Sequence, residues 1–303
     1  MNLRSRFKVI TYNVLALLLI CATLLTLCFF GSFDKTLGYF EGDSSLPYLF
    51  RAAYTVAIAF ILISCYLYIK CKKMSTEDAI LPPFFKVICL SVGALALIYS
   101  VYGLAVALIT STAPVYTVIS YIGALAFGGF LICAFAKGGF EYSGAKLALL
   151  CLSVFFPLGL AMKNVIYLFR PSNSVENILS AVISISLLIY ILNEGKRMTS
   201  GTVTRAYPAS LLLSLFSSAT LSASYIAGYI GSAVNEVERF RDMLLCLALS
   251  IYFACALFTF IASVKEKNDS EKLPEDEAET EAKAETETET KAEIETEGEI
   301  TNE

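Results

Sequence analysis

Apolar residues along the chain gather into eight long runs, separated by short breaks that contain polar residues, proline or glycine. A helix needs roughly 20 residues to cross a hydrocarbon layer of about 30 Å. The runs therefore predict membrane-spanning helices at approximately residues 8–30, 47–69, 84–109, 114–136, 147–169, 175–193, 207–233 and 243–264. A membrane β-barrel would instead alternate apolar and polar residues in segments of about ten. The pattern predicts an all-α, polytopic transmembrane bundle over residues 1–265, with the lipid bilayer as its surroundings.

The connections between these runs are short, and the longest covers approximately residues 31–46. No soluble catalytic domain fits between the spans. Any activity of residues 1–265 must therefore come from the helices themselves.

The charges divide the chain into two parts. Apolar residues make up 56% of the sequence, charged residues only 17%, and the formal net charge is -4. Residues 1–265 hold 19 Lys and Arg against 11 Asp and Glu, whereas residues 266–303 hold 4 against 16. Of the basic residues near span ends, fourteen fall on the side of the two termini and six on the other side. The predicted location is the cytoplasmic membrane, and the positive-inside bias predicts that both termini lie in the cytoplasm.

Residues 266–303 form an acidic tail of repeated Glu-Thr and Lys-Ala-Glu units. Glu285, Glu289 and Glu293 are spaced four apart and would repel one another on a helix. The tail has almost no apolar residue to bury, so disorder is predicted. It is a candidate docking arm for a protein partner with basic residues, or a solubilising segment.

The composition removes several classes of chemistry. The sequence has no histidine, so Ser-His-Asp and Cys-His catalysis and histidine-containing metal sites lack their central group. The nine cysteines are scattered without a C-x-x-C pair, and no Gly-rich phosphate-binding motif is present. The sequence predicts no catalytic, cofactor-binding or metal residues and no nucleic-acid partner. The acidic residues of the body fall in predicted loops or at span ends, so we expect no enzyme and no deep carboxylate for proton or cation coupling.

Lys163 is the basic residue that lies deepest inside a predicted span. Lys163 and Asn164 are about six residues before the outer end of the fifth span, hence about 9 Å below it. With Arg51, and beside the kink expected at Pro157, they would line an outward pocket for an anion or a lipid phosphate. The alternatives are that Lys163 extends its ammonium to the headgroups and that the kink is ordinary packing.

The seventh span is rich in serine and threonine. Its hydroxyls around Ser222, together with Tyr225 and Tyr229, would form the polar wall of a path for a small solute. The alternative is close packing through small residues spaced four apart. These stripes are Ala219, Ala223, Ala227 and Gly231 on the seventh span, and Ser120, Ala124 and Gly128 on the fourth.

The sequence favours a permease or carrier for a small solute, lipid or anion, with the fifth and seventh spans as its pathway. The second hypothesis is a non-catalytic scaffold or sensor subunit that engages a partner through the acidic tail. A hydrated cavity near Lys163, Asn164 and residues 222–229 would favour the carrier, and a dry, packed bundle would favour the scaffold.

Overall fold

The computed structural model describes residues 3–34, 39–40, 44–68, 73–76, 83–110, 113–136, 142–168, 175–231 and 237–266. Within these residues, eight helical segments are long and apolar enough to cross a membrane. The predicted all-α, multi-pass membrane fold is therefore confirmed. The predicted disordered tail lies, from residue 267 onward, outside the described residues.

The helices follow one another along the chain with short connections. They are α1 (Leu3–Gly31), α2 (Ser45–Tyr68), α3 (Pro83–Thr110), α4 (Val115–Ala136), α5 (Gly144–Ser153), α6 (Phe155–Leu168), α7 (Val175–Ser200), α8 (Ala206–Ile230) and α9 (Val237–Ser263). Helices α5 and α6 together make the fifth span.

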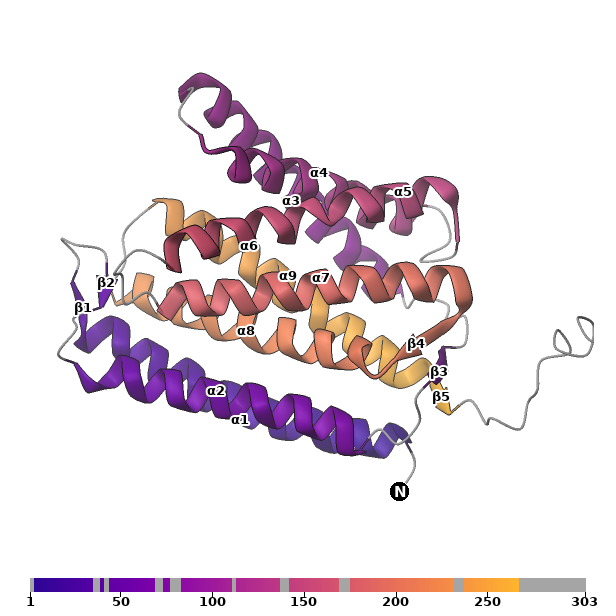
Figure 1. Cartoon of the computed structure of the whole chain (residues 1–303), viewed down its shortest axis with the longest axis horizontal. Coiled ribbons are helices and arrows are strands. Elements are labelled where there is room, and N and C mark those ends of the chain that lie inside the picture. The colour runs from indigo at the N-terminus through magenta and orange to yellow at the C-terminus, as the bar shows by residue number, and fades with distance from the viewer. Residues whose placement is uncertain are drawn as a thin grey trace, which may run out of the picture. The chain divides into compact units, whose positions relative to one another are not determined.

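Short strands join the connections at the two ends of the bundle (Figure 1). At one end, β1 (Phe33–Asp34) pairs with β2 (Tyr39–Phe40). At the other end, β3 (Lys73–Thr76) pairs antiparallel with both β4 (Thr202–Thr204) and β5 (Val264–Glu266). This three-stranded sheet connects the segments that follow α2, α7 and α9.

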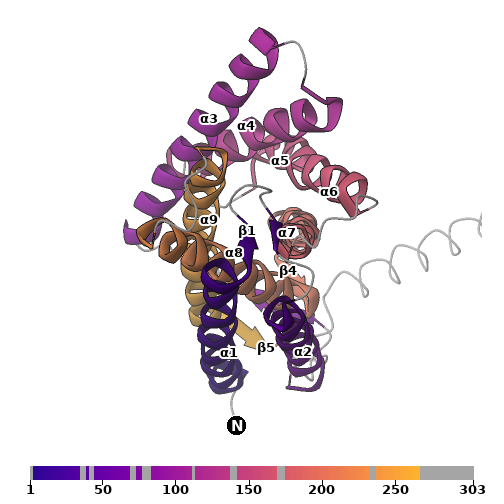
Figure 2. The same ribbon diagram turned by 90° about the vertical axis from the view of Figure 1, so that its left-hand side faces the viewer.

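Helix α8 is the central element of the bundle. It contacts α1, α2, α7 and α9, which surround it in Figure 2. It has the lowest hydropathy of the eight segments, yet 78% of its most apolar window is buried, compared with 28% for α1, α2 and α3. Hydroxyl groups are poorly accommodated in hydrocarbon, so the most polar helix is the one that the other helices shield from lipid.

The fifth span is interrupted at Val154, where α5 ends and α6 begins. Pro157 has no amide hydrogen to continue the helical ladder, which explains a break one turn before it. Helix α4 approaches α6 very closely beside this break. A Cβ atom on Gly123 would lie 1.9 Å from the Phe156 nitrogen, and one on Gly159 would lie 2.5 Å from the Tyr116 carbonyl oxygen. Glycine is required at both positions because the two backbones are in contact.

Helix α7 continues to Ser200, seven residues beyond the predicted end of the sixth span. Gly201 follows with φ of +62°, and its amide donates to the Arg197 carbonyl at 2.9 Å. This left-handed glycine is a common way to end a helix. The last two turns of α7 therefore belong to the bundle, and they include Glu194 and Arg197.

Candidate functional site

Glu194 is the buried acidic residue around which the candidate site is built. It lies six residues before the end of α7, hence about 9 Å along the helix from that end, and it is 0% exposed. The sequence pattern placed it just beyond a span, among loop and helix-end residues. That placement is wrong, because α7 does not end at residue 193. An ionisable group inside a candidate span is a default functional candidate.

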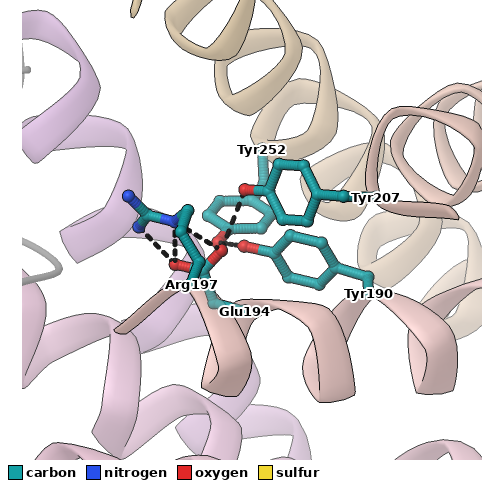
Figure 3. Close-up of polar contacts among 5 residues, drawn as sticks. All are labelled: Tyr190, Glu194, Arg197, Tyr207 and Tyr252. Carbon is teal, nitrogen blue, oxygen red and sulfur yellow. Dashed lines mark hydrogen bonds and ion pairs between the residues drawn. The ribbon is translucent and has the colours of Figure 1, made fainter. Parts of the chain in front are cut away.

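Two side chains hold the Glu194 carboxylate (Figure 3). Arg197, one turn later on α7, donates from Nε to both carboxylate oxygens at 3.2 Å and from Nη2 to Oε1 at 2.5 Å. Tyr207, in the first turn of α8, donates its hydroxyl to Oε2 at 2.8 Å. The negative charge is thus balanced by an adjacent cation and a neutral donor, which is the condition for burying a carboxylate.

Two further tyrosines lie beside this pair. The hydroxyls of Tyr190 on α7 and Tyr252 on α9 share a hydrogen bond of 2.5 Å. The Tyr190 ring also packs against Tyr207, with ring centroids 5.8 Å apart. The five side chains, Tyr190, Glu194, Arg197, Tyr207 and Tyr252, form what we call the Glu194 cluster. It joins α7, α8 and α9 through polar contacts at the end of the bundle where the three-stranded sheet lies.

Access to the Glu194 cluster is asymmetric. The Arg197 side chain is 22% exposed, while that of Glu194 is 1% exposed. A solute that reaches the cluster from outside the bundle meets the guanidinium first. Chemically, the cluster offers an anion contact at Arg197 and a buried carboxylate that would be released only if Arg197 changed partner.

The signal for this cluster was present in the sequence. Glu194 and Arg197 are three residues apart, which places them on the same helical face, and Ser200-Gly201 is a helix-stop signal. Met198 completes the same buried face. The apolar run becomes weak after residue 193, and a boundary set by hydropathy alone excludes the last two turns.

The hydroxyls of α8 bond to neighbouring helices. Ser214 donates to Ser186 on α7 at 2.8 Å, and Ser217 shares a hydrogen bond of 2.6 Å with Tyr54 on α2. Ser218 accepts from Ser250 on α9 at 2.9 Å, and Ser224 donates to the Ala22 carbonyl on α1 at 3.3 Å. The four serines Ser214, Ser217, Ser218 and Ser224 have no exposed surface. They connect α8 to each of its four neighbours, and we call them the serine spine.

The predicted path residues of α8 also have partners within the bundle. Ser222 donates to the Ala219 carbonyl of its own helix at 3.2 Å. Tyr225 lies against Phe29 of α1, and Tyr229 against Phe240 of α9, with ring centroids 5.7 and 5.6 Å apart. These side chains therefore contact different helices and do not share one wall.

The predicted outward pocket residues are also separated. Asn164 is buried and donates to Ser180 and Ser184 of α7 at 3.2 and 3.5 Å. Lys163, its neighbour on α6, is partly exposed, and Pro157 is buried. Arg51 lies on α2 with its guanidinium over the Tyr48 ring, 5.5 Å from the centroid. Among these residues, Lys163 and Asn164 are adjacent, but Arg51 belongs to a helix that packs on α1 and α8.

The two stripes of small residues lie as follows. On α4, a Cβ atom on Gly128 would lie 2.7 Å from the Gly93 carbonyl oxygen of α3. Ala124 is buried. Ser120 donates to the Phe156 carbonyl of α6 at 3.3 Å. On α8, Gly231 lies against Phe30 of α1. The alanines of the α8 stripe are less buried than the serine spine: Ala219 and Ala227 are half-buried and Ala223 is exposed.

The described residues contain no group of three or more acidic, cysteine or histidine side chains that would hold a metal ion. Polar chemistry in this part of the chain is concentrated in the Glu194 cluster and the serine spine. Comparisons with protein families, curated proteins and solved structures found no significant match.

Proposed function

We propose that this chain is a non-catalytic membrane scaffold, whose helical body holds the acidic segment 266–303 at the cytoplasmic face for a protein partner. The observation that carries the proposal is the serine spine. Ser214, Ser217 and Ser218 of α8 are buried and hydrogen-bonded to other helices, and Ser222 is buried and bonds within α8. A helix connected to four neighbours in this way is suited to hold a fixed shape.

The strand pairing at the start of the acidic segment supports the proposal. The segment 266–303 follows α9, and its first residue, Glu266, lies in β5. The pairing of β5 with β3 attaches the start of the acidic segment to the connection between α2 and α3. The acidic segment therefore begins at the sheet that joins three connections of the bundle.

Cysteine accessibility along α8 tests the proposal without knowledge of a substrate. The nine native cysteines are replaced, and a single cysteine is introduced by Ser214→Cys, Ser218→Cys or Ser222→Cys. Membranes opened to both sides are treated with a water-soluble methanethiosulfonate reagent. We expect the three positions to stay unlabelled, because each lies in packed protein. Ser200→Cys, at the exposed end of α7, is the matched control and should be labelled rapidly.

The decisive outcome concerns the three interior positions. Labelling of any of them at a rate within about tenfold of Ser200→Cys would mean that water reaches the interior of α8, and the scaffold proposal would be wrong. The same Ser200→Cys variant, treated with an impermeant reagent in intact cells, tests orientation. Protection there, and labelling after permeabilisation, is expected if the sheet end faces the cytoplasm.

A carrier is the second candidate, because the Glu194 cluster places a buried carboxylate and a partly exposed guanidinium within one span. Such a pair exchanges partners in a carrier that takes up an ion. Under this hypothesis, Ser214→Cys and Ser218→Cys become labelled in some state of the protein. Deletion of 267–303 would then leave transport intact, whereas under the scaffold proposal it abolishes partner binding.

A further inference from the structure

A pocket lies between α3 and α9, on the side of the bundle away from α1 and α2. Its volume is about 290 Å³, and its walls are mainly apolar, including Leu95 and Val106 of α3 and Leu245 of α9. Tyr99 and Arg241 supply its polar groups. Figure 1 shows the end of α3 and the start of α4 projecting away from α9. Residues of α3 and α9 line the pocket.

The pocket matches the depth of one membrane leaflet. Along α3 its lining runs from Leu95 to Val106, a rise of about 16 Å at 1.5 Å per residue. Half of a hydrocarbon layer of about 30 Å is close to this length. Val106 lies one turn before the end of α3, at the end of the bundle where β1 and β2 lie. The α3 wall of the pocket is therefore about as long as one leaflet is thick.

Arg241 is the basic residue of the pocket lining. It is the second residue of the apolar segment Phe240–Ser263, and its side chain is 27% exposed. The guanidinium lies over the Tyr99 ring, 5.3 Å from the centroid, and its Nε is 3.5 Å from Asp242 Oδ1. Stacking on the ring orients a planar group that has several donors and matches the geometry of a phosphate.

We propose that this pocket binds an anionic phospholipid from the leaflet on the β1–β2 side, with one acyl chain between α3 and α9 and the phosphate at Arg241. The walls suit a hydrocarbon chain, and the Arg241 guanidinium beside Tyr99 suits the phosphate. A second spanning helix is a poor occupant, because the lining covers only about 16 Å of α3 whereas a spanning helix presents an apolar length of about 30 Å. This site is independent of the proposed scaffold function.

Native mass spectrometry of the detergent-solubilised chain tests this proposal, with phosphatidylglycerol and a diacylglycerol of the same acyl chains as probes. Arg241→Gln should reduce phosphatidylglycerol binding by about fivefold, since one interfacial cation contributes about that factor with an anionic headgroup. Diacylglycerol binding should be unchanged in this variant. Arg51→Gln is the matched control, because Arg51 also lies over a tyrosine ring near a helix end but outside the pocket.

A second variant tests the acyl chain. Leu244→Phe fills the pocket with a larger ring and should weaken the binding of both lipids, whereas Leu19→Phe, on an exposed face of α1, should not. Equal phosphatidylglycerol binding by Arg241→Gln and Arg51→Gln would overturn the phosphate assignment. Lipid binding unaffected by Leu244→Phe, or a dimer that this variant abolishes, would overturn the pocket assignment.

Discussion

Replacing Arg197 by methionine removes the cation that balances the Glu194 carboxylate but keeps an unbranched side chain at this helical position. The carboxylate retains the hydrogen bond from Tyr207. Its 1% exposure gives it little contact with water to replace the lost charge partner. The substitution therefore leaves a buried charge without its cation, which is among the most destabilising changes that a single residue can cause.

The magnitude follows from the burial of the two partners. Removing one member of a fully buried ion pair lowers the free energy of unfolding by about 3–5 kcal/mol. Arg197 is 22% exposed, so water already screens part of the interaction and the lower end applies. We expect a loss of about 3 kcal/mol for Arg197→Met. Lys196→Met is the matched control, because Lys196 is exposed on the same turn and its loss should change stability by less than about 0.5 kcal/mol.

The double variant separates charge from packing. Glu194→Gln removes the negative charge but keeps the shape of the side chain and an acceptor for Tyr207. When Glu194→Gln is added to Arg197→Met, the free energy of unfolding should rise again by about 2 kcal/mol, because the double variant buries no unpaired charge. The coupling between the two substitutions is the quantity that reports the ion pair.

Unfolding in mixed micelles with increasing SDS, followed by far-ultraviolet circular dichroism, gives the four free energies of this cycle. Additive effects would refute this reasoning. If the losses caused by Glu194→Gln and Arg197→Met simply sum in the double variant, the two side chains contribute separately and Arg197 does not neutralise a buried charge. A single Arg197→Met effect no larger than that of Lys196→Met would refute the burial of Glu194 itself.

Two other predictions concern helix packing, and the same unfolding measurement checks both. Gly123→Ala should destabilise the bundle by about 3 kcal/mol, because the added methyl meets the Phe156 backbone, whereas Gly144→Ala, which meets nothing within 4 Å, should have no destabilising effect. Equal melting of the two variants would contradict the close approach of α4 and α6. Tyr54→Phe and Ser217→Ala should each cost about 0.6–1.7 kcal/mol, and the double variant should cost little more than either one, because both break the same hydrogen bond. Additive losses would show that the two hydroxyls bond elsewhere.

The Glu194 cluster shows why part of the site escaped prediction. Glu194 and Arg197 were visible as residues, but their burial depends on where α7 ends, and the end is determined by Gly201 and by packing against α8. Hydropathy averages over a window and treats the pair as a boundary. The partners Tyr207 and Tyr252 come from other helices, so no spacing along the chain connects them to Glu194.

The partners of the serine spine could not be predicted from the sequence either. The sequence identified α8 as the most polar span, and hydroxyls in a span are compatible with both a water-lined path and contacts between helices. Whether Ser217 faces water or Tyr54 depends on a residue 163 positions earlier in the chain. In the structure the neighbouring helices supply hydrogen-bond partners for these hydroxyls, because each hydroxyl in hydrocarbon must find one.

The sequence by itself determined the class of the protein, the number of spans and the helical form of each. Those properties follow from the transfer of long apolar runs out of water and from backbone hydrogen bonds made within each run, and both are local. Only the tertiary structure decided that the most polar span lies at the centre, that Glu194 is buried against Arg197 and Tyr207, and that α3 and α9 enclose a pocket. These features depend on which helices are neighbours, and polar groups acquire their partners only when distant helices pack together.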